Sequence, residues 1–144
     1  MHRRLLLSAA VLPLLAACSG AELDPIFVRD PANLPHPVIF FSEDSTVLDD
    51  AAKGTIREAA ETAGRFGDAR VNVFGYAGPI GGAAFNRQLS DARAQVVAAE
   101  LRRNGVASER IFVVPRGPVP FDMAPIESRR VEIRFAAPAP RPPQ

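Results

Sequence analysis

Arg93 is the residue whose surroundings most clearly indicate chemistry in this chain of 144 residues. It falls at steps of four along a predicted helix whose other side chains in that lane are apolar. The lane consists of Phe85, Leu89, Arg93, Val97 and Leu101. Because desolvating an unpaired charge is costly, an arginine in such a lane needs a partner.

A glycine-rich turn precedes this helix. Its glycines are Gly75, Gly78, Gly81 and Gly82. Backbone N–H groups at such a turn and at a helix start can receive a carboxylate. We therefore predict an anion site made of these amides and the Arg93 guanidinium. The alternative is that the arginine stem packs against the core and its head pairs with Asp91, Glu132 or water.

Other chemistry has little support in the sequence. The histidines are His2 and His36, and the single cysteine is Cys18, so neither a histidine-based metal site nor a thiol nucleophile is expected within the fold. The serines have no partner histidine by pattern, and Asp49-Asp50 more naturally caps a helix than binds metal. The net charge of +1 argues against a nucleic-acid binder that works by bulk charge. We expect no enzyme activity, no cofactor and no metal.

The first residues have the pattern of an export signal. A basic start is followed by an apolar run from Leu5 to Leu15, which is shorter than the ~20 residues that span a bilayer. The sequence Leu15-Ala16-Ala17-Cys18 resembles the lipobox of bacterial lipoproteins. The resemblance implies a signal peptide over residues 1–17, lipid such as palmitate on Cys18, and, because Ser19 is not aspartate, an outer-membrane location.

The rest of the chain predicts one globular domain between two proline-marked segments. At 47% hydrophobic residues, the chain can form a single core. Residues 18–37 are expected to form a lipidated tether, 38–136 the folded domain, and 137–144 an extended proline-rich tail. Periodicity predicts strands near 38–41, 70–76, 111–114 and 131–135, and helices from about 50 to 66 and from 84 to 103.

The first predicted helix has one apolar face, and the last strand alternates cleanly. The helical face consists of Leu48, Ala52, Ile56, Ala59, Ala63 and Phe66. In the strand, Val131, Ile133 and Phe135 are expected to point inward, and Glu132 and Arg134 outward. The order strand, helix, strand, helix, strand, strand predicts a two-layer α/β (α+β) sandwich with both helices on one sheet face.

Residues 38–135 resemble the OmpA-like peptidoglycan-binding domain. The resemblance is most specific where the family carries glycine-histidine-threonine-aspartate, a glycine, and then asparagine, leucine-serine, arginine-alanine, valine and leucine. The matching residues are Gly75, Tyr76, Ala77, Gly78, Gly81, Asn86, Leu89, Ser90, Arg93, Ala94, Val97 and Leu101. Ser128-Arg129-Arg130-Val131-Glu132 resembles the closing motif. The resemblance implies a mixed sheet and a non-catalytic wall-binding role.

In that family the ligand is the diaminopimelate side chain of the peptidoglycan stem peptide, a zwitterion. The resemblance places Arg93 on its carboxylate and Asn86 nearby. The family aspartate that takes the ammonium is Gly78 here, and the neighbouring threonine and histidine are Ala77 and Tyr76. Losing one partner of a desolvated charge pair costs ~2–5 kcal/mol.

Two functional hypotheses follow from these substitutions. In the first, another acid compensates for Gly78, the candidates being Asp44, Asp91 and Asp122, and the protein tethers the outer membrane to peptidoglycan. In the second, wall binding is lost and the domain is a structural or protein-interaction module with envelope partners. An acid beside Gly78 in the folded chain would favour the first.

Overall fold

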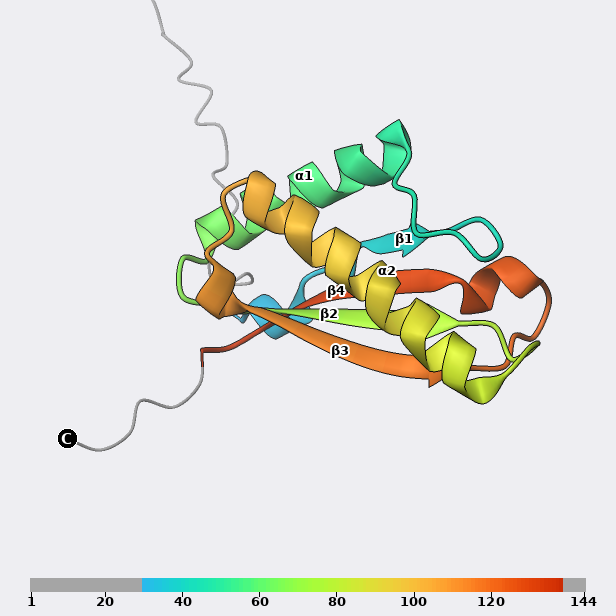
Figure 1. Ribbon diagram of the computed structural model, residues 1–144. Coiled ribbons are helices and arrows are strands. Elements are labelled where there is room, and N and C mark those ends of the chain that lie inside the picture. Colours follow the sequence, from blue (N-terminus) through green and yellow to red (C-terminus); the bar gives the residue numbers. More distant parts are fainter. Residues whose placement is uncertain (1–29, 139–144) are drawn as a thin grey trace, which may run out of the picture.

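The computed structural model describes residues 30–138 (Figure 1). The order of strands and helices confirms the predicted fold class. The helices and strands are β1 (Val38–Phe40), α1 (Asp50–Arg65), β2 (Arg70–Ala77), α2 (Ala83–Arg103), β3 (Ile111–Pro118) and β4 (Arg130–Ala136). Short 3₁₀ turns that the sequence reasoning did not anticipate are η2 (Pro31–Asn33), η3 (Ser108–Arg110) and η4 (Pro125–Ser128).

The four strands form one mixed sheet in the order β1-β4-β2-β3. The β2–β3 pair is parallel, whereas β4 runs antiparallel to both β1 and β2. Both helices lie on the same face of this sheet, as Figure 1 shows. The fold is therefore a two-layer sandwich whose second sheet face carries no α-helix within residues 30–138.

Helix α1 begins where its sequence predicts. The Asp49 carboxylate accepts a hydrogen bond of 2.7 Å from the Ala52 amide, which caps the first turn. The predicted apolar face is buried at Ala52, Ile56, Ala59 and Ala63. The helix faces the interior with small residues, which lets it pack closely against β1 and α2.

Helix α2 crosses β2 at a position where only glycine fits. A Cβ on Gly75 would lie 2.0 Å from the Ser90 carbonyl oxygen. The predicted lane of α2 is buried at Leu89, Arg93, Val97 and Leu101. Its first member is the exception, because Phe85 is 51% exposed. The helix stops at Asn104, and Gly105 follows with a φ of +93°, as the Asn-Gly pair predicts.

Strand β4 alternates as predicted, with one difference. Val131, Ile133 and Phe135 are buried under the helices. Glu132 points to the opposite face but is only 8% exposed, because Arg130 and Arg134 both bind its carboxylate. The alternation of β4 predicts the outward direction of Glu132. It does not predict the burial, which arises because the side chains of Arg130 and Arg134 fold over the carboxylate.

The packed structure begins before residue 38, within the predicted tether of residues 18–37. Pro31 is buried, Leu34 packs against the core, and the Pro37 carbonyl accepts a 2.9 Å hydrogen bond from the Ile133 amide. Residues 1–29, with the predicted signal peptide and Cys18, and the tail from 139 onward lie outside the described residues. Among residues 30–138, no helix combines the length and apolar character needed to cross a membrane.

The close approach at Gly75 generates a stability prediction. We expect Gly75→Ala to destabilise the domain by about 3 kcal/mol or more, because the new methyl group meets backbone rather than a side chain that can move. The matched control is Gly54→Ala in α1, where a Cβ meets nothing within 4 Å and should stabilise by about 0.5–1 kcal/mol. Urea unfolding measures both, and equal midpoints would contradict the packing described.

Candidate binding site

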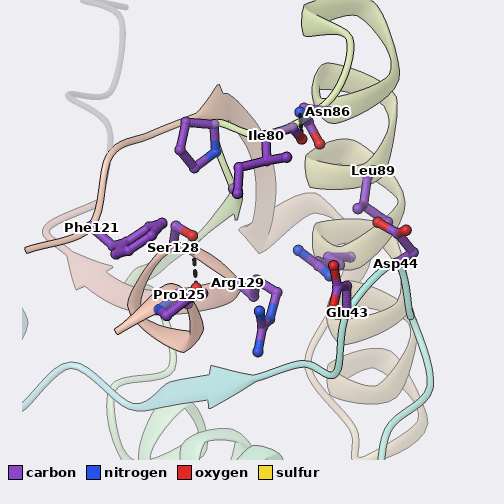
Figure 2. Close-up of a pocket in the computed structure, with 12 residues that line it drawn as sticks. Glu43, Asp44, Ile80, Asn86, Leu89, Phe121, Pro125, Ser128 and Arg129 are labelled. Atoms are coloured by element: carbon purple, nitrogen blue, oxygen red, sulfur yellow. Dashed lines mark hydrogen bonds between the residues drawn. The ribbon is translucent and has the colours of Figure 1, made fainter. Parts of the chain in front are cut away.

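A small cavity opens at the end of the sheet where the β1–α1 loop, the β2–α2 loop and η4 meet. Its volume is about 140 Å³, room for roughly four or five water molecules. The lining residues are Glu43, Asp44, Gly78, Pro79, Ile80, Asn86, Leu89, Arg93, Phe121, Pro125, Ser128 and Arg129. Figure 2 shows Glu43, Asp44 and Leu89 on one side and Phe121, Pro125 and Ser128 on the other.

Arg93 reaches this cavity from the buried lane of α2, and its side chain is completely buried. Its Nε donates to the Ser45 carbonyl at 2.9 Å, one terminal nitrogen donates to the Ser42 carbonyl at 3.0 Å, and the other donates to the Tyr76 carbonyl at 3.3 Å. The guanidinium therefore fastens the β1–α1 loop to α2 and to the end of β2.

The two acids that the alternative interpretation offered as partners of Arg93, Asp91 and Glu132, do not bind it. Asp91 accepts instead from Gln95, and Glu132 lies on the other sheet face between two arginines. The partners of Arg93 are instead backbone carbonyls, which accept hydrogen bonds from its N–H groups without adding a buried charge. A guanidinium has five N–H groups, so one on each terminal nitrogen of Arg93 is left beyond these three bonds.

Charges around Arg93 act in opposite directions. Burial lowers the pKa of the Arg93 guanidinium from its ordinary value, the nearby Arg129 lowers it further, and Asp44 raises it. Arginine stays protonated at neutral pH even so. The site thus contains two positive charges, Arg93 and Arg129, and favours a negative group between them.

Two carboxylates line the same cavity from the β1–α1 loop. Asp44 and Glu43 are both solvent-exposed residues of a turn in which the Ser45 amide donates to the Ser42 carbonyl. Asp44 has a φ of +46°, in the left-handed region that few non-glycine residues adopt. Such backbone strain persists only where surrounding contacts impose it, here the two carbonyl bonds to Arg93 on either side.

Of the three acids considered as substitutes for the family aspartate, Asp44 is the one that lines this cavity. Asp91 lies on α2 and bonds to Gln95, and Asp122 lines a separate hollow beside Arg130. Glu43 and Arg129 were not singled out as site residues. The sequence does carry an indication of both, because an acidic pair follows the first predicted strand and an arginine pair precedes the last predicted strand.

Asn86 holds the glycine-rich loop. It is almost fully buried, and its side-chain amide donates to the Ile80 carbonyl at 2.8 Å while its backbone N–H donates to Gly82. The loop bends at Gly81, whose φ of +99° favours glycine. Asn86 lines the cavity as well, so it both shapes and borders the site.

The remaining predicted site residues divide between the two faces of the sheet. Gly78 lines the cavity, and a Cβ there would meet the Ser128 hydroxyl at an ordinary 3.4 Å. Ala77 is buried in β2 and does not line the cavity. The Tyr76 ring points to the opposite face, where Arg130 stacks on it at 4.2 Å, and only its carbonyl meets Arg93. Strand alternation separates these consecutive residues.

Within residues 30–138, histidine, cysteine and carboxylate side chains form no cluster of three that could hold a metal ion. The cavity offers charges of both signs, from Glu43 and Asp44 and from Arg93 and Arg129, an arrangement that suits a small charged group.

Comparison with protein families matches residues 40–127 to the OmpA family. The chain belongs to the OmpA family. A relative in Escherichia coli (strain K12), probable lipoprotein YiaD, is 36% identical over 86 residues, which cover 60% of this chain and 39% of the relative. The alignment with this chain therefore spans less than half the length of that relative.

Solved OmpA-like structures share the fold. The peptidoglycan-associated lipoprotein of Burkholderia pseudomallei superposes with a TM-score of 0.64 at 20% identity, covering 78% of this chain and 97% of that one. The OmpA-like domain of FopA1 from Francisella tularensis gives 0.61 at 24% identity, with 72% of each chain covered. The periplasmic domain of Helicobacter pylori MotB gives 0.60 at 20% identity, covering 69% of this chain and 71% of that one.

The Arg93 bonds generate a second stability prediction. We expect Arg93→Lys to lose about 2–4 kcal/mol, because an ammonium on a shorter head cannot reach three diverging carbonyls. Amide exchange of residues 42–49 should rise in this variant. The control is Arg57→Lys on the exposed side of α1, expected within about 0.5 kcal/mol of wild type. An Arg93→Lys protein as stable as the control would show that the three bonds contribute little.

Proposed function

We propose that this OmpA-like domain binds the diaminopimelate side chain of peptidoglycan stem peptides and turns over no substrate. The observation that carries the proposal is one small cavity lined by two carboxylates and two guanidinium groups. Such a site fits the end of a zwitterionic side chain, which presents an ammonium and a carboxylate on one carbon. A ligand with a single charge would leave either the two carboxylates or the two guanidinium groups without a partner.

The residues divide the ligand between them. The free N–H groups of Arg93, with Arg129, receive the carboxylate in charge-assisted hydrogen bonds. Asp44, with Glu43 at the rim, takes the ammonium that the family aspartate would take at position 78. Gly78 leaves open volume next to Ser128, and Asn86 holds the loop that closes the cavity. The acid has thus moved from the β2–α2 loop to the β1–α1 loop.

The comparisons support an envelope role. One structural neighbour is named a peptidoglycan-associated lipoprotein, and the YiaD relative is named a probable lipoprotein. The residues replaced at Tyr76, Ala77 and Gly78 favour the second candidate, a domain that has given up the wall and serves as an interaction module. The acids at the β1–α1 loop favour wall binding.

A binding experiment separates the two functions. We expect the chain from residue 19 onward to sediment with purified peptidoglycan of the diaminopimelate type, and Asp44→Asn to weaken binding at least tenfold. Asparagine tolerates the positive φ of Asp44, so this variant removes charge without refolding the loop. Glu61→Gln, an exposed acid on α1, is the matched control and should bind as wild type.

Further arms of the same experiment identify the ligand group. A wall that carries lysine in place of diaminopimelate lacks the carboxylate and should bind weakly. In Gly78→Asp the added Cβ lies at an ordinary 3.4 Å from the Ser128 hydroxyl, and this variant should bind at least as tightly as wild type. If wild type fails to sediment and Gly78→Asp alone does, the wall-binding proposal is wrong and the interaction-module candidate stands.

We also propose that residues 1–17 are a signal peptide and that Cys18 carries lipid, palmitate among its chains, which anchors the domain to the periplasmic side of the outer membrane. The eleven residues from 19 to 29 would extend at most ~40 Å before the packed structure begins. Two or more chains are needed for stable anchoring. Labelling cells with a palmitate analogue tests the attachment. We expect label on the wild type and none on Cys18→Ser, whereas equal labelling would place the lipid elsewhere.

A further inference from the structure

The sheet face away from the helices bears a set of arginines stacked on aromatic rings. Arg70 lies 4.0 Å from the Phe112 ring centroid, and Arg116 and Arg134 lie 4.8 and 5.2 Å from that of Phe74. We call the β2 and β3 part of this surface, made of Arg70, Phe74, Phe112 and Arg116, the open face. No α-helix of residues 30–138 covers it (Figure 1).

Charge on this side of the sheet is unevenly balanced. Arg130 and Arg134 bind the Glu132 carboxylate at 2.7 and 2.5 Å. Burial raises the pKa of Glu132, but the hydrogen bonds and charges of the two arginines outweigh it and hold the pKa below its ordinary value. This carboxylate is therefore fully engaged with the β4 arginines and leaves nothing for the open face.

Arg70 and Arg116 have no such partner. Neither guanidinium donates a hydrogen bond to any residue between 30 and 138, and the Nε of Arg70 is buried without an acceptor. Strands β2 and β3 contain no acidic residue. Two preoriented guanidinium groups thus stand on one flat surface with their carboxylate-binding capacity unused.

We propose that the open face docks an acidic polypeptide segment of a partner protein. Stacking on Phe112 and Phe74 fixes both guanidinium groups, which lowers the entropy cost of binding carboxylates in the two-pronged arrangement. Arginine and aromatic side chains are also the types enriched in protein interfaces. Phe112 pairs with Asn72, two positions from Phe74, so the two guanidinium groups lie over neighbouring rings and a short extended segment reaches both.

Other occupants fit less well. A second copy of this chain would bring positive charge against positive charge. A bilayer surface is bound through apolar rings that protrude freely, whereas Phe74 is half-buried and both Phe74 and Phe112 have a guanidinium group stacked on the ring. Addition of a strand to the β3 edge is hindered because Pro115 and Pro118 lack an N–H. The docking surface is therefore the face of the sheet.

A labelled glutamate 20-mer tests the proposal by fluorescence anisotropy with the mature protein in nonionic detergent. We expect wild type to bind and Arg70→Gln with Arg116→Gln to bind roughly tenfold more weakly. The matched control replaces Arg57 and Arg102, two exposed helix arginines, by glutamine and so changes net charge equally. It should stay within about twofold of wild type, and thermal melts confirm that both double variants fold.

Each other outcome overturns the proposal. If peptide binding weakens equally in both double variants, the attraction comes from net charge. If it weakens in neither, the open face does not bind the peptide. If micelles doped with phosphatidylglycerol displace the peptide through the same two arginines, the face belongs to a lipid surface. The readout does not depend on peptidoglycan, so it is separate from the test of the cavity.

Discussion

The buried guanidinium of Arg93 holds together three segments that are distant in sequence. Its bonds to the carbonyls of Ser42, Ser45 and Tyr76 tie α2 to the β1–α1 loop and to the end of β2. A neutral side chain in this place would leave three carbonyls without donors. The same group borders the cavity, so the stability of the loop and the anion site proposed above depend on one side chain. A change at Arg93 is therefore expected to alter both properties at once.

Because Arg93 fixes the β1–α1 loop, an acid on that loop can serve the cavity in place of an acid at position 78, and the scaffold stays the same. Because Arg93 holds Ser42 and Ser45, the turn between them carries Asp44 to the cavity in a left-handed conformation. The family position for the acid, Gly78, faces the same space from the opposite loop. In the proposed function, a carboxylate from either loop meets the ammonium of the ligand at this point, so the fold constrains where the charge lies more than which residue supplies it.

The two faces of the sheet use arginine differently. On the helix side, Arg93 is buried, and it satisfies backbone carbonyls and borders a small cavity. On the other side, arginines stack on Phe74, Phe112 and Tyr76, and two of them, Arg70 and Arg116, donate no side-chain hydrogen bond within residues 30–138. The separation follows from strand alternation, which sends neighbouring residues of β2 to opposite sides. In the two proposals above, one domain binds anionic groups at two surfaces that do not overlap.

Local sequence was sufficient for the elements and for part of the site. Asp49 as a cap, the small-residue face of α1, the Asn-Gly end of α2 and the alternation of β4 all depend on near neighbours, and each was predicted. Arg93 stood out because it interrupts an apolar lane. The carbonyl partners of Arg93 and the placement of Asp44, Glu43 and Arg129 around one cavity were decided by tertiary structure alone. These depend on contacts between residues tens of positions apart, and periodicity holds no information about which distant backbone atoms a buried charge will meet.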